Sequence, residues 1–286
     1  MKLRVWISMN KKLILITGAT AGIGEAAAHA LAAQGHELII VGRNPQKTSL
    51  VAERIRTQTG NDDIHFLLAD FSDLQQIREL AEQVKTQFSK LDVLINNAGT
   101  YYSQRQKTKY GAEKTFVVNH LAPFLLTNLL LDHLQDHARI VNVSSNSHYD
   151  GKLDLNDLNL RKFYFGLTAY QRSKLANVLF TYELVRRLAD TTVTVNALHP
   201  GLVATDIFQR DLGILGPLLK GIISRFSITP EAGADTTVFL ATSTEVEGVT
   251  CKYFAKRNAV TSAPLSYDEA LAKQLWKVSE RLTAIS

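Results

Sequence analysis

Tyr170 and Lys174 lie four residues apart within 168–189, a stretch whose apolar spacing predicts a helix. Residues at i and i+4 share one face of a helix, so the two side chains are within reach of each other. A free phenol has a pKa of about 10, and a fixed ammonium nearby stabilises the phenolate and so lowers that pKa. Tyr170 is therefore a candidate general acid or base, although such a pair is more often a packed tyrosine beside a solvated lysine.

A glycine-rich segment, Thr17-Gly18-Ala19-Thr20-Ala21-Gly22-Ile23-Gly24, joins a predicted strand at 13–17 to a predicted helix at 22–34. Glycines at such a junction let the backbone approach a pyrophosphate, whose charge is stabilised by unpaired N–H groups and the helix dipole. A tight turn without a ligand is the alternative interpretation. The spacing G-x-x-x-G-x-G also differs from the dinucleotide fingerprint G-x-G-x-x-G.

The elements that must position these side chains alternate along the whole chain. Strands are predicted at 13–17, 37–41, 64–69, 93–95, 139–143, 193–198 and 250–254, and helices at 22–34, 46–58, 73–88, 111–134, 168–189 and 230–242. The strand runs are continuously apolar, as expected when both faces of a sheet are covered. We therefore predict an α/β fold with a doubly wound parallel sheet, in a single domain spanning 1–286.

The composition excludes several classes of protein. With 45% hydrophobic and 21% charged residues among 286, the chain is neither disordered, collagenous nor disulfide-rich. The 32 Lys and Arg exceed the 27 Asp and Glu by 5, but the excess is spread along the chain, so we expect no nucleic-acid partner. Cys251 is the single cysteine, which excludes an internal disulfide and suits a reducing compartment; we expect a cytoplasmic location.

We expect no spanning membrane segment, no cleaved signal and no metal site. The most apolar run, 121–131, is shorter than the ~18 to 20 residues that cross a bilayer and contains Pro123. His133 and His137 have helical spacing but lack the acidic partner of a zinc motif. Residues 1–10 are expected to be an extension ahead of the first strand.

Further motifs follow the glycine segment, and their order is informative. They are Asn96-Asn97-Ala98-Gly99, Asn119, Ser144-Ser145, Tyr170-Gln171-Arg172-Ser173-Lys174 and His199-Pro200-Gly201 with Thr205. Over about residues 11–255 the chain resembles the short-chain dehydrogenase/reductase family. The resemblance implies a Rossmann-type sheet of seven strands in the order 3-2-1-4-5-6-7 and hydride transfer with a nicotinamide cofactor.

The resemblance also implies a catalytic set of Asn119, Ser145, Tyr170 and Lys174. It places the substrate-binding serine second in its pair, so Ser145 is favoured, with Ser144 as a competitor. Asn119 would help to hold Lys174 and a water in a proton relay. From the residues alone, that amide could equally satisfy backbone groups within a kinked helix.

Cofactor contacts are implied for a larger set: Gly18, Thr20, Gly22, Ile23, Gly24, Arg43, Asn44, Asp70, Phe71, Asn97, Ala98, Gly99, Tyr170, Lys174, Pro200, Gly201, Val203 and Thr205. Asp70 would contact the adenine, or cap the helix that begins near Leu74. The end of the second strand has Arg43 and no carboxylate. A guanidinium suits a ribose 2′-phosphate whereas NAD requires an acid there, so we expect NADP(H).

Several stretches look like the retinol dehydrogenase-like and WW-domain oxidoreductase-type members of the family, including Asn119-His120-Leu121, 151–166 and 267–276. Those relatives act on retinoids and other apolar aldehydes and alcohols. We therefore expect a small apolar carbonyl or alcohol substrate, contacted by Ser145, Tyr170, His148 and Tyr149.

Residues 207–229 are apolar and interrupted by glycines, which predicts a substrate lid. Weak peripheral membrane attachment through 212–226 is a less favoured interpretation of the same stretch. The helices predicted at 111–134 and 168–189 resemble those through which family members dimerise, so the resemblance implies a homodimer. The alternative to an enzyme is a catalytically silent NADP(H)-binding sensor or interaction protein on the same fold.

Overall fold

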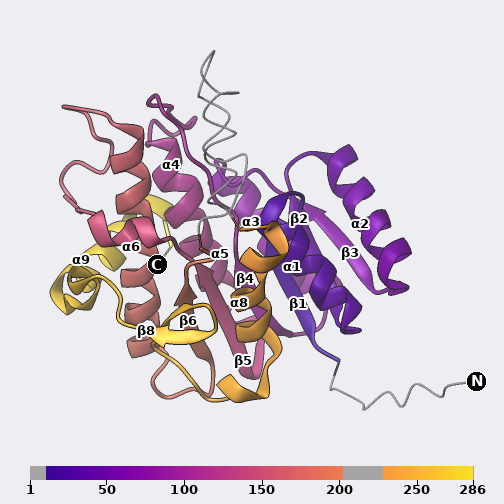
Figure 1. Cartoon of the computed structure of the whole chain (residues 1–286). Helices are drawn as coiled ribbons and strands as arrows, with labels where there is room; N and C mark the ends of the chain where they lie inside the picture. Colours follow the sequence, from indigo (N-terminus) through magenta and orange to yellow (C-terminus); the bar gives the residue numbers. More distant parts are fainter. Residues whose placement is uncertain (1–10, 202–227, 286) are drawn as a thin grey trace, which may run out of the picture.

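The computed structural model describes residues 11–201 and 228–285 (Figure 1). Its centre is a sheet in the order β3-β2-β1-β4-β5-β6-β7-β8. The strands are β1 (Leu13–Thr17), β2 (Glu37–Gly42), β3 (Ile64–Leu68), β4 (Leu91–Asn96), β5 (Leu134–Val143), β6 (Thr194–Leu198), β7 (Tyr253–Ala255) and β8 (Asn258–Val260). The first seven are parallel and follow the predicted order, which confirms the predicted fold class.

An eighth strand that the sequence analysis did not predict extends the sheet. β8 pairs antiparallel with β7, and Ala255 lies opposite Asn258 across a two-residue turn. Lys256 and Arg257 in that turn have φ values of 49° and 62°. Hairpin turns of this kind favour Asn or Gly at both positions, so Lys-Arg carries no hairpin signal.

Helices cover both faces of the sheet (Figure 1). They are α1 (Gly22–Ala33), α2 (Pro45–Thr59), α3 (Leu74–Gln87), α4 (Lys114–Phe116), α5 (Ala122–Leu130), α6 (Gly166–Arg187), α8 (Pro230–Thr242) and α9 (Glu269–Thr283). A π-helical turn, η1 (Val117–Leu121), joins α4 to α5, and short 3-10 turns are η2 (Leu131–His133), η3 (Asn146–Asp150), η5 (Thr244–Val246) and η6 (Pro264–Tyr267). Helix α9 was not among the predicted helices.

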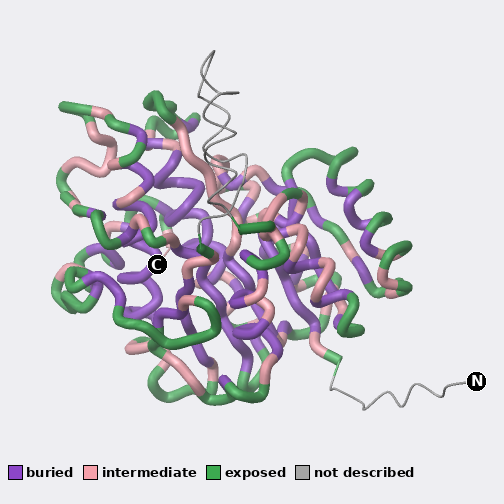
Figure 2. Tube along the Cα trace, viewed as in Figure 1, coloured by how far each residue is buried: buried purple, intermediate pink, exposed green. Residues whose placement is uncertain are grey.

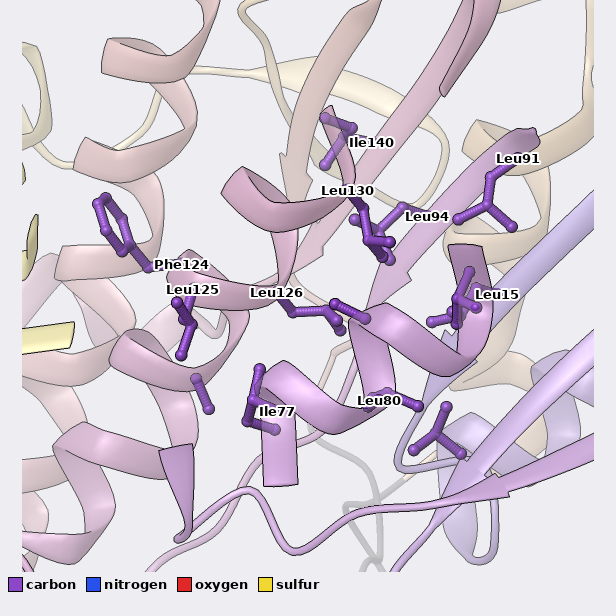
Figure 3. Close-up of a cluster of buried hydrophobic side chains, with 14 of the residues drawn as sticks. Leu15, Ile77, Leu80, Leu91, Leu94, Phe124, Leu125, Leu126, Leu130 and Ile140 are labelled. Carbon is purple, nitrogen blue, oxygen red and sulfur yellow. The ribbon is translucent and has the colours of Figure 1, made fainter. Parts of the chain in front are cut away.

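Each central strand contributes to two cores because successive side chains point to opposite faces. Leu13 and Leu15 of β1 pack with α3 and α5, in the cluster shown in Figure 3. Ile14 and Ile16 pack on the other face with α1, α2 and α8. The continuously apolar strands thus reflect a sheet that is buried on both sides, visible as the purple interior of Figure 2.

The helical segment Lys114–His133 is apolar enough to cross a membrane by length and composition alone. However, 72% of its most apolar window is buried inside the protein. A core helix meets the same criteria, so the segment is weak evidence for a span. The predicted extension, 1–10, and the predicted lid, 207–229, lie outside the described residues, except for the last two residues of the lid.

Candidate active site

The predicted cofactor and catalytic residues gather where the parallel strands end. The glycine segment follows β1 and Asn97 follows β4, the two neighbouring strands from which the chain winds in opposite directions. In doubly wound sheets, ligands bind outside the carboxyl ends of the strands at this switch point. The sheet order therefore brings together segments that are about 80 residues apart in the chain.

Asn97 fastens the glycine segment to the end of β4. Its Nδ2 donates to the carbonyl oxygens of Thr17 at 2.9 Å and Gly18 at 3.2 Å. The hydroxyl of Thr17 in turn accepts from the backbone N–H groups of Asn97 and Ala98, both at 3.0 Å. These bonds hold the turn after β1 in one conformation.

Glycine is required in this turn for two reasons. Gly18 has a φ of 66°, a left-handed conformation that side chains disfavour. At Gly24 a Cβ would lie 2.3 Å from the carbonyl oxygen of Gly18 and 2.4 Å from Nδ2 of Asn97. Helix α1 can therefore begin close against the end of β1 only if position 24 has no side chain.

The N-terminus of α1 differs from those of several other helices. Helices α2, α3, α8 and α9 begin after Asn44, Asp73, Thr229 and Asp268, whose side chains accept from backbone N–H groups of the first turn. Ala21 precedes α1 and provides no such cap. The first N–H groups of α1, which begins at Gly22 and includes Ile23, therefore have no side-chain acceptor, as a phosphate site requires.

Arg43 and Asn44 follow β2, the strand next to β1 in the sheet, and both residues are exposed. Gly42, the last residue of β2, packs closely against Thr20 and Thr48, since a Cβ there would lie 2.5 Å from the methyl group of Thr20. Oδ1 of Asn44 accepts from the backbone N–H of Lys47 at 2.8 Å and caps α2. Arg43 is thus placed beside the turn by a well-packed strand end, with its guanidinium in solvent.

Asp70 does not cap α3, so that structural alternative is wrong. The N-cap of α3 is Asp73, whose Oδ1 accepts from the N–H of Gln75 at 3.1 Å. Oδ1 of Asp70 instead accepts from the backbone and hydroxyl of Ser72, both at 2.8 Å. The side chain of Phe71, the next residue, is buried in the core that includes α3.

Tyr170 and Lys174 share one face of α6, as their spacing predicts. Nζ of Lys174 lies 5.6 Å from the ring centroid of Tyr170 and donates to the carbonyl oxygen of Val143 at 3.0 Å. The two residues are only 7% and 4% exposed. Gly99 faces them, because a Cβ there would lie 3.4 Å from Nζ of Lys174.

Burial dominates the electrostatics of this pair. It lowers the pKa of Lys174 to about 8. It raises the pKa of Tyr170, against a smaller opposing effect of the hydrogen bond to Ser145. The expected lowering of the phenol pKa is therefore not seen in the chain by itself, because desolvation of the phenolate outweighs the hydrogen bond to Ser145.

The two serines after β5 have different partners. The hydroxyl of Ser144 donates to the carbonyl oxygen of Lys174 at 2.8 Å and is buried. Ser145 is half-buried, and its side chain hydrogen-bonds to that of Tyr170. The structure thus brings Ser145 to the phenol and uses Ser144 to fasten β5 to α6.

Asn119 lies in the π-helical turn η1 and is fully buried. Its Oδ1 accepts from the N–H of Thr100 at 2.7 Å, and its Nδ2 donates to the carbonyl of Thr100 and the hydroxyl of Ser173, both at 2.9 Å. The amide therefore joins the loop after β4 to α6. Its Oδ1 also lies near Gly99, 3.6 Å from where a Cβ would be.

His148, which was predicted to contact the substrate, has no exposed surface in the structure. His148 is fully buried, and its Nδ1 bonds to the carbonyl of Ser145 at 2.8 Å. Its Nε2 accepts from the N–H of Ala263 at 3.0 Å, so the proton is on Nδ1 and the ring is neutral. Both ring nitrogens are used inside the protein, and burial lowers the pKa of His148 to about 4.

Tyr149 is directed elsewhere as well. Its side chain is 43% exposed, and its hydroxyl donates to the carbonyl oxygen of Thr261. That bond fastens η3 to the segment after β8.

Tyr101 is a residue near Tyr170 that the sequence analysis did not identify. Its ring lies edge-on to that of Tyr170, with the ring centroids 6.2 Å apart. Its position two residues after Gly99 is the only signal for it.

Pro200 and Gly201 follow β6 at the same edge of the sheet. Gly201 has a φ of 89°, and a Cβ there would lie 2.8 Å from Cδ1 of Ile228. Val203 and Thr205, the other predicted contacts in this segment, lie outside the described residues. Among residues 11–201 and 228–285, no group of three His, Cys, Asp or Glu side chains is placed to hold a metal ion.

Together these residues form a site with the glycine turn and the uncapped N-terminus of α1 at one end and the buried pair of Tyr170 and Lys174 at the other. Residues 12–212 match the family model described as short chain dehydrogenase. The chain is 40% identical to retinol dehydrogenase 14 of Mus musculus, over 97% of this chain and 87% of that protein. It is 38% identical to the polyprenol dehydrogenase of Homo sapiens, over 96% of this chain and 86% of that protein.

Solved structures of similar proteins have the same fold. An uncharacterized protein from Mycobacterium paratuberculosis superposes with a TM-score of 0.77 at 32% identity, covering 96% of this chain and 93% of that one. A short chain dehydrogenase from Burkholderia cenocepacia, solved in complex with NADP, has a TM-score of 0.68 at 26% identity, covering 85% and 95%.

Proposed function

The chain belongs to the short-chain dehydrogenase family, among members similar to the retinol dehydrogenases, and is thus an oxidoreductase that uses a nicotinamide cofactor; we propose that it is NADP(H)-dependent and acts on apolar carbonyl compounds or alcohols. The observation that carries this proposal is the burial of Tyr170 and Lys174 beside Ser145. That group lies at the same sheet edge as the glycine turn.

The residues present fit a dinucleotide. The uncapped N-terminus of α1 and the closely packed Gly18 and Gly24 would hold the pyrophosphate. Asn97 would keep that turn rigid, and Gly99 leaves open space in front of Nζ of Lys174. A ribose hydroxyl is the kind of acceptor that a buried ammonium would bind there.

NADP(H) is proposed over NAD(H) because of the charge at the end of β2. Arg43 is exposed there. Neither of its neighbours, Gly42 and Asn44, has a carboxylate that could accept a hydrogen bond from a ribose 2′-hydroxyl. A guanidinium can bind a 2′-phosphate through two parallel hydrogen bonds. The Burkholderia cenocepacia relative, solved with NADP, supports the same choice.

We propose that Tyr170 exchanges a proton with the substrate oxygen and that Ser145 orients this oxygen with its hydroxyl. When bound, the nicotinamide supplies or accepts the hydride. Lys174 would stabilise negative charge on the phenol, and its carbonyl contact with Val143 fixes the ammonium in position. Asn119 acts as a positioning residue, because its amide joins Thr100 to Ser173 on α6.

The apolar substrate class is supported by the surroundings of Tyr170. The Tyr101 ring lies beside it, and Ile228 lies against Gly201 at the end of β6. The names of the relatives point the same way, since retinol and polyprenol are long apolar alcohols. A pocket of this kind binds mainly by apolar contact, with few polar groups to orient the ligand.

The test is oxidation of NADPH, followed by its near-ultraviolet absorbance, with aldehydes that range from short chains to all-trans-retinal. We expect turnover on the longer aldehydes, loss of at least a hundredfold in Tyr170→Phe, and a weaker preference for NADPH over NADH in Arg43→Gln. Tight binding of NADPH without turnover on any aldehyde or alcohol would instead support the alternative, a silent cofactor-binding sensor.

A further inference from the structure

Two phenylalanines protrude from the loop that precedes the catalytic helix α6. Phe163 is 89% exposed, more than any other large hydrophobic side chain in the described part of the chain, and Phe165 is 65% exposed. An exposed phenylalanine loses the free energy that its side chain would gain on burial away from water. Neighbouring exposed aromatic side chains therefore commonly mark a contact surface. Figure 2 shows the chain before α6 partly in the colour of exposed residues and partly in that of intermediate ones.

These side chains are held outward by their neighbours. Between them, Tyr164 points into the protein and donates its hydroxyl to the carbonyl oxygen of Tyr102 at 3.0 Å. Gly166 packs so closely that a Cβ would lie 2.4 Å from the same carbonyl oxygen. Because successive residues of an extended segment point in opposite directions, anchoring Tyr164 directs Phe163 and Phe165 to solvent.

A buried ion pair lies next to the same loop and holds it in place. Nη2 of Arg172 lies 3.5 Å from Oε2 of Glu113, and both side chains are almost completely buried. Arg172 also donates to the carbonyl oxygens of Asp157 and Leu158. The loop before α6 is thus fastened both to α6 and to the segment before α4.

A basic cavity opens between the same two segments. It has a volume of about 300 Å³ and is lined by Arg105, Lys107, Gly111, Asn159 and Arg161. None of its three cations forms an ion pair with a carboxylate of the residues that the structure describes.

The acidic groups nearest in the chain are already engaged. The carboxylate of Asp157 accepts from the backbone N–H of Arg161, at 2.9 Å for each oxygen. The carboxylate of Glu113 caps α4 through the N–H groups of Thr115 and Phe116. Three cations line the cavity against the one nearby carboxylate of Asp157, because Glu113 pairs with Arg172, so the cavity has net positive charge. Its Arg161 lies two residues before Phe163 in the chain.

We propose that Arg105, Lys107, Arg161, Phe163 and Phe165 form a docking surface for an anionic lipid bilayer. The cavity would bind a lipid phosphate, and the two rings would enter the boundary between headgroups and acyl chains. A bilayer fits better than a protein partner, because a fluid phase closes around two protruding rings, whereas a stable protein interface needs a broad complementary surface.

Phe165, the last residue of this surface in the chain, lies five residues before Tyr170. Docking would therefore bring the entrance of the site close to a phase in which apolar alcohols and aldehydes dissolve. That consequence depends on the proposed function, whereas lipid binding itself does not.

The experiment is flotation of the full chain with vesicles of three parts phosphatidylcholine to one part phosphatidylglycerol, and with phosphatidylcholine alone. We expect flotation with the anionic vesicles only. Phe163→Ser with Phe165→Ser should weaken it at least tenfold, and Arg105→Gln with Arg161→Gln about 25-fold, at about fivefold for each cation. Leu50→Ser on α2, where Leu50 is 70% exposed, is the matched apolar control and should leave flotation unchanged.

Two outcomes would overturn the docking surface. One is absence of flotation on the anionic vesicles, and the other is equal flotation of the double phenylalanine variant and the Leu50 control. If sedimentation shows a dimer that the phenylalanine variant dissociates, a second copy covers this surface instead. Turnover of a short, water-soluble aldehyde without vesicles should be unchanged in all three variants, and this reports on the proposed activity separately.

Discussion

His148 offers the sharpest test of how the site is held in place. Its ring connects the carbonyl oxygen of Ser145 to the backbone N–H of Ala263, 115 residues further along the chain. In His148→Leu, the N–H of Ala263 remains buried without an acceptor, while the Ser145 carbonyl retains only the N–H of residue 148. We expect the free energy of unfolding to fall by about 2 to 4 kcal/mol at pH 7, measured by urea denaturation.

The pH dependence of that difference is the more specific prediction. The pKa of His148 is about 4 in the folded chain and 6.5 as its ordinary value, because burial disfavours the charged ring. Below pH 6.5 the unfolded chain takes up the proton first, so the native state loses stability as the pH falls. The pKa difference of 2.5 corresponds to about 3 kcal/mol, lost progressively between pH 6.5 and pH 4.

His148→Leu lacks this titration, so the stability gap between wild type and variant should narrow by about 3 kcal/mol from pH 7 to pH 4. His137→Asn, which removes an exposed histidine, is the control. A gap that stays constant for His148→Leu would refute the buried neutral tautomer. Turnover should fall in the same variant if the Ser145 carbonyl is displaced.

Three further predictions concern the turn, the buried ion pair and the lysine. Gly24→Ala places a Cβ 2.3 Å from the carbonyl oxygen of Gly18, so NADPH binding measured by calorimetry should be lost while a folded chain remains visible by circular dichroism. Glu113→Gln leaves Arg172 buried without its carboxylate and should lower the free energy of unfolding by about 3 to 5 kcal/mol in urea. The ammonium of Lys174 loses its proton above its pKa of about 8, so kcat/KM for NADPH should fall above that pH. Lys174→Arg should shift this fall to higher pH, and an unshifted profile would assign it to another group.

The local parts of the site could be predicted because they depend only on spacing along the chain. Tyr170 and Lys174 share a helix face wherever α6 lies, and the turn after β1 requires glycine for reasons internal to that turn. The alternation of buried strands and amphipathic helices likewise indicated a doubly wound sheet, since continuously apolar strands need cover on both faces.

Tertiary structure alone decided the roles of the polar residues around that frame. Ser144 and Ser145 are equivalent as sequence, and only the packing of α6 against β5 gives Ser144 the carbonyl of Lys174 and Ser145 the phenol. His148 was predicted to face the substrate, yet a segment more than a hundred residues later supplies its partner. A hydrogen bond between distant segments depends on which backbone groups packing leaves unpaired, and spacing along the chain carries no information about that.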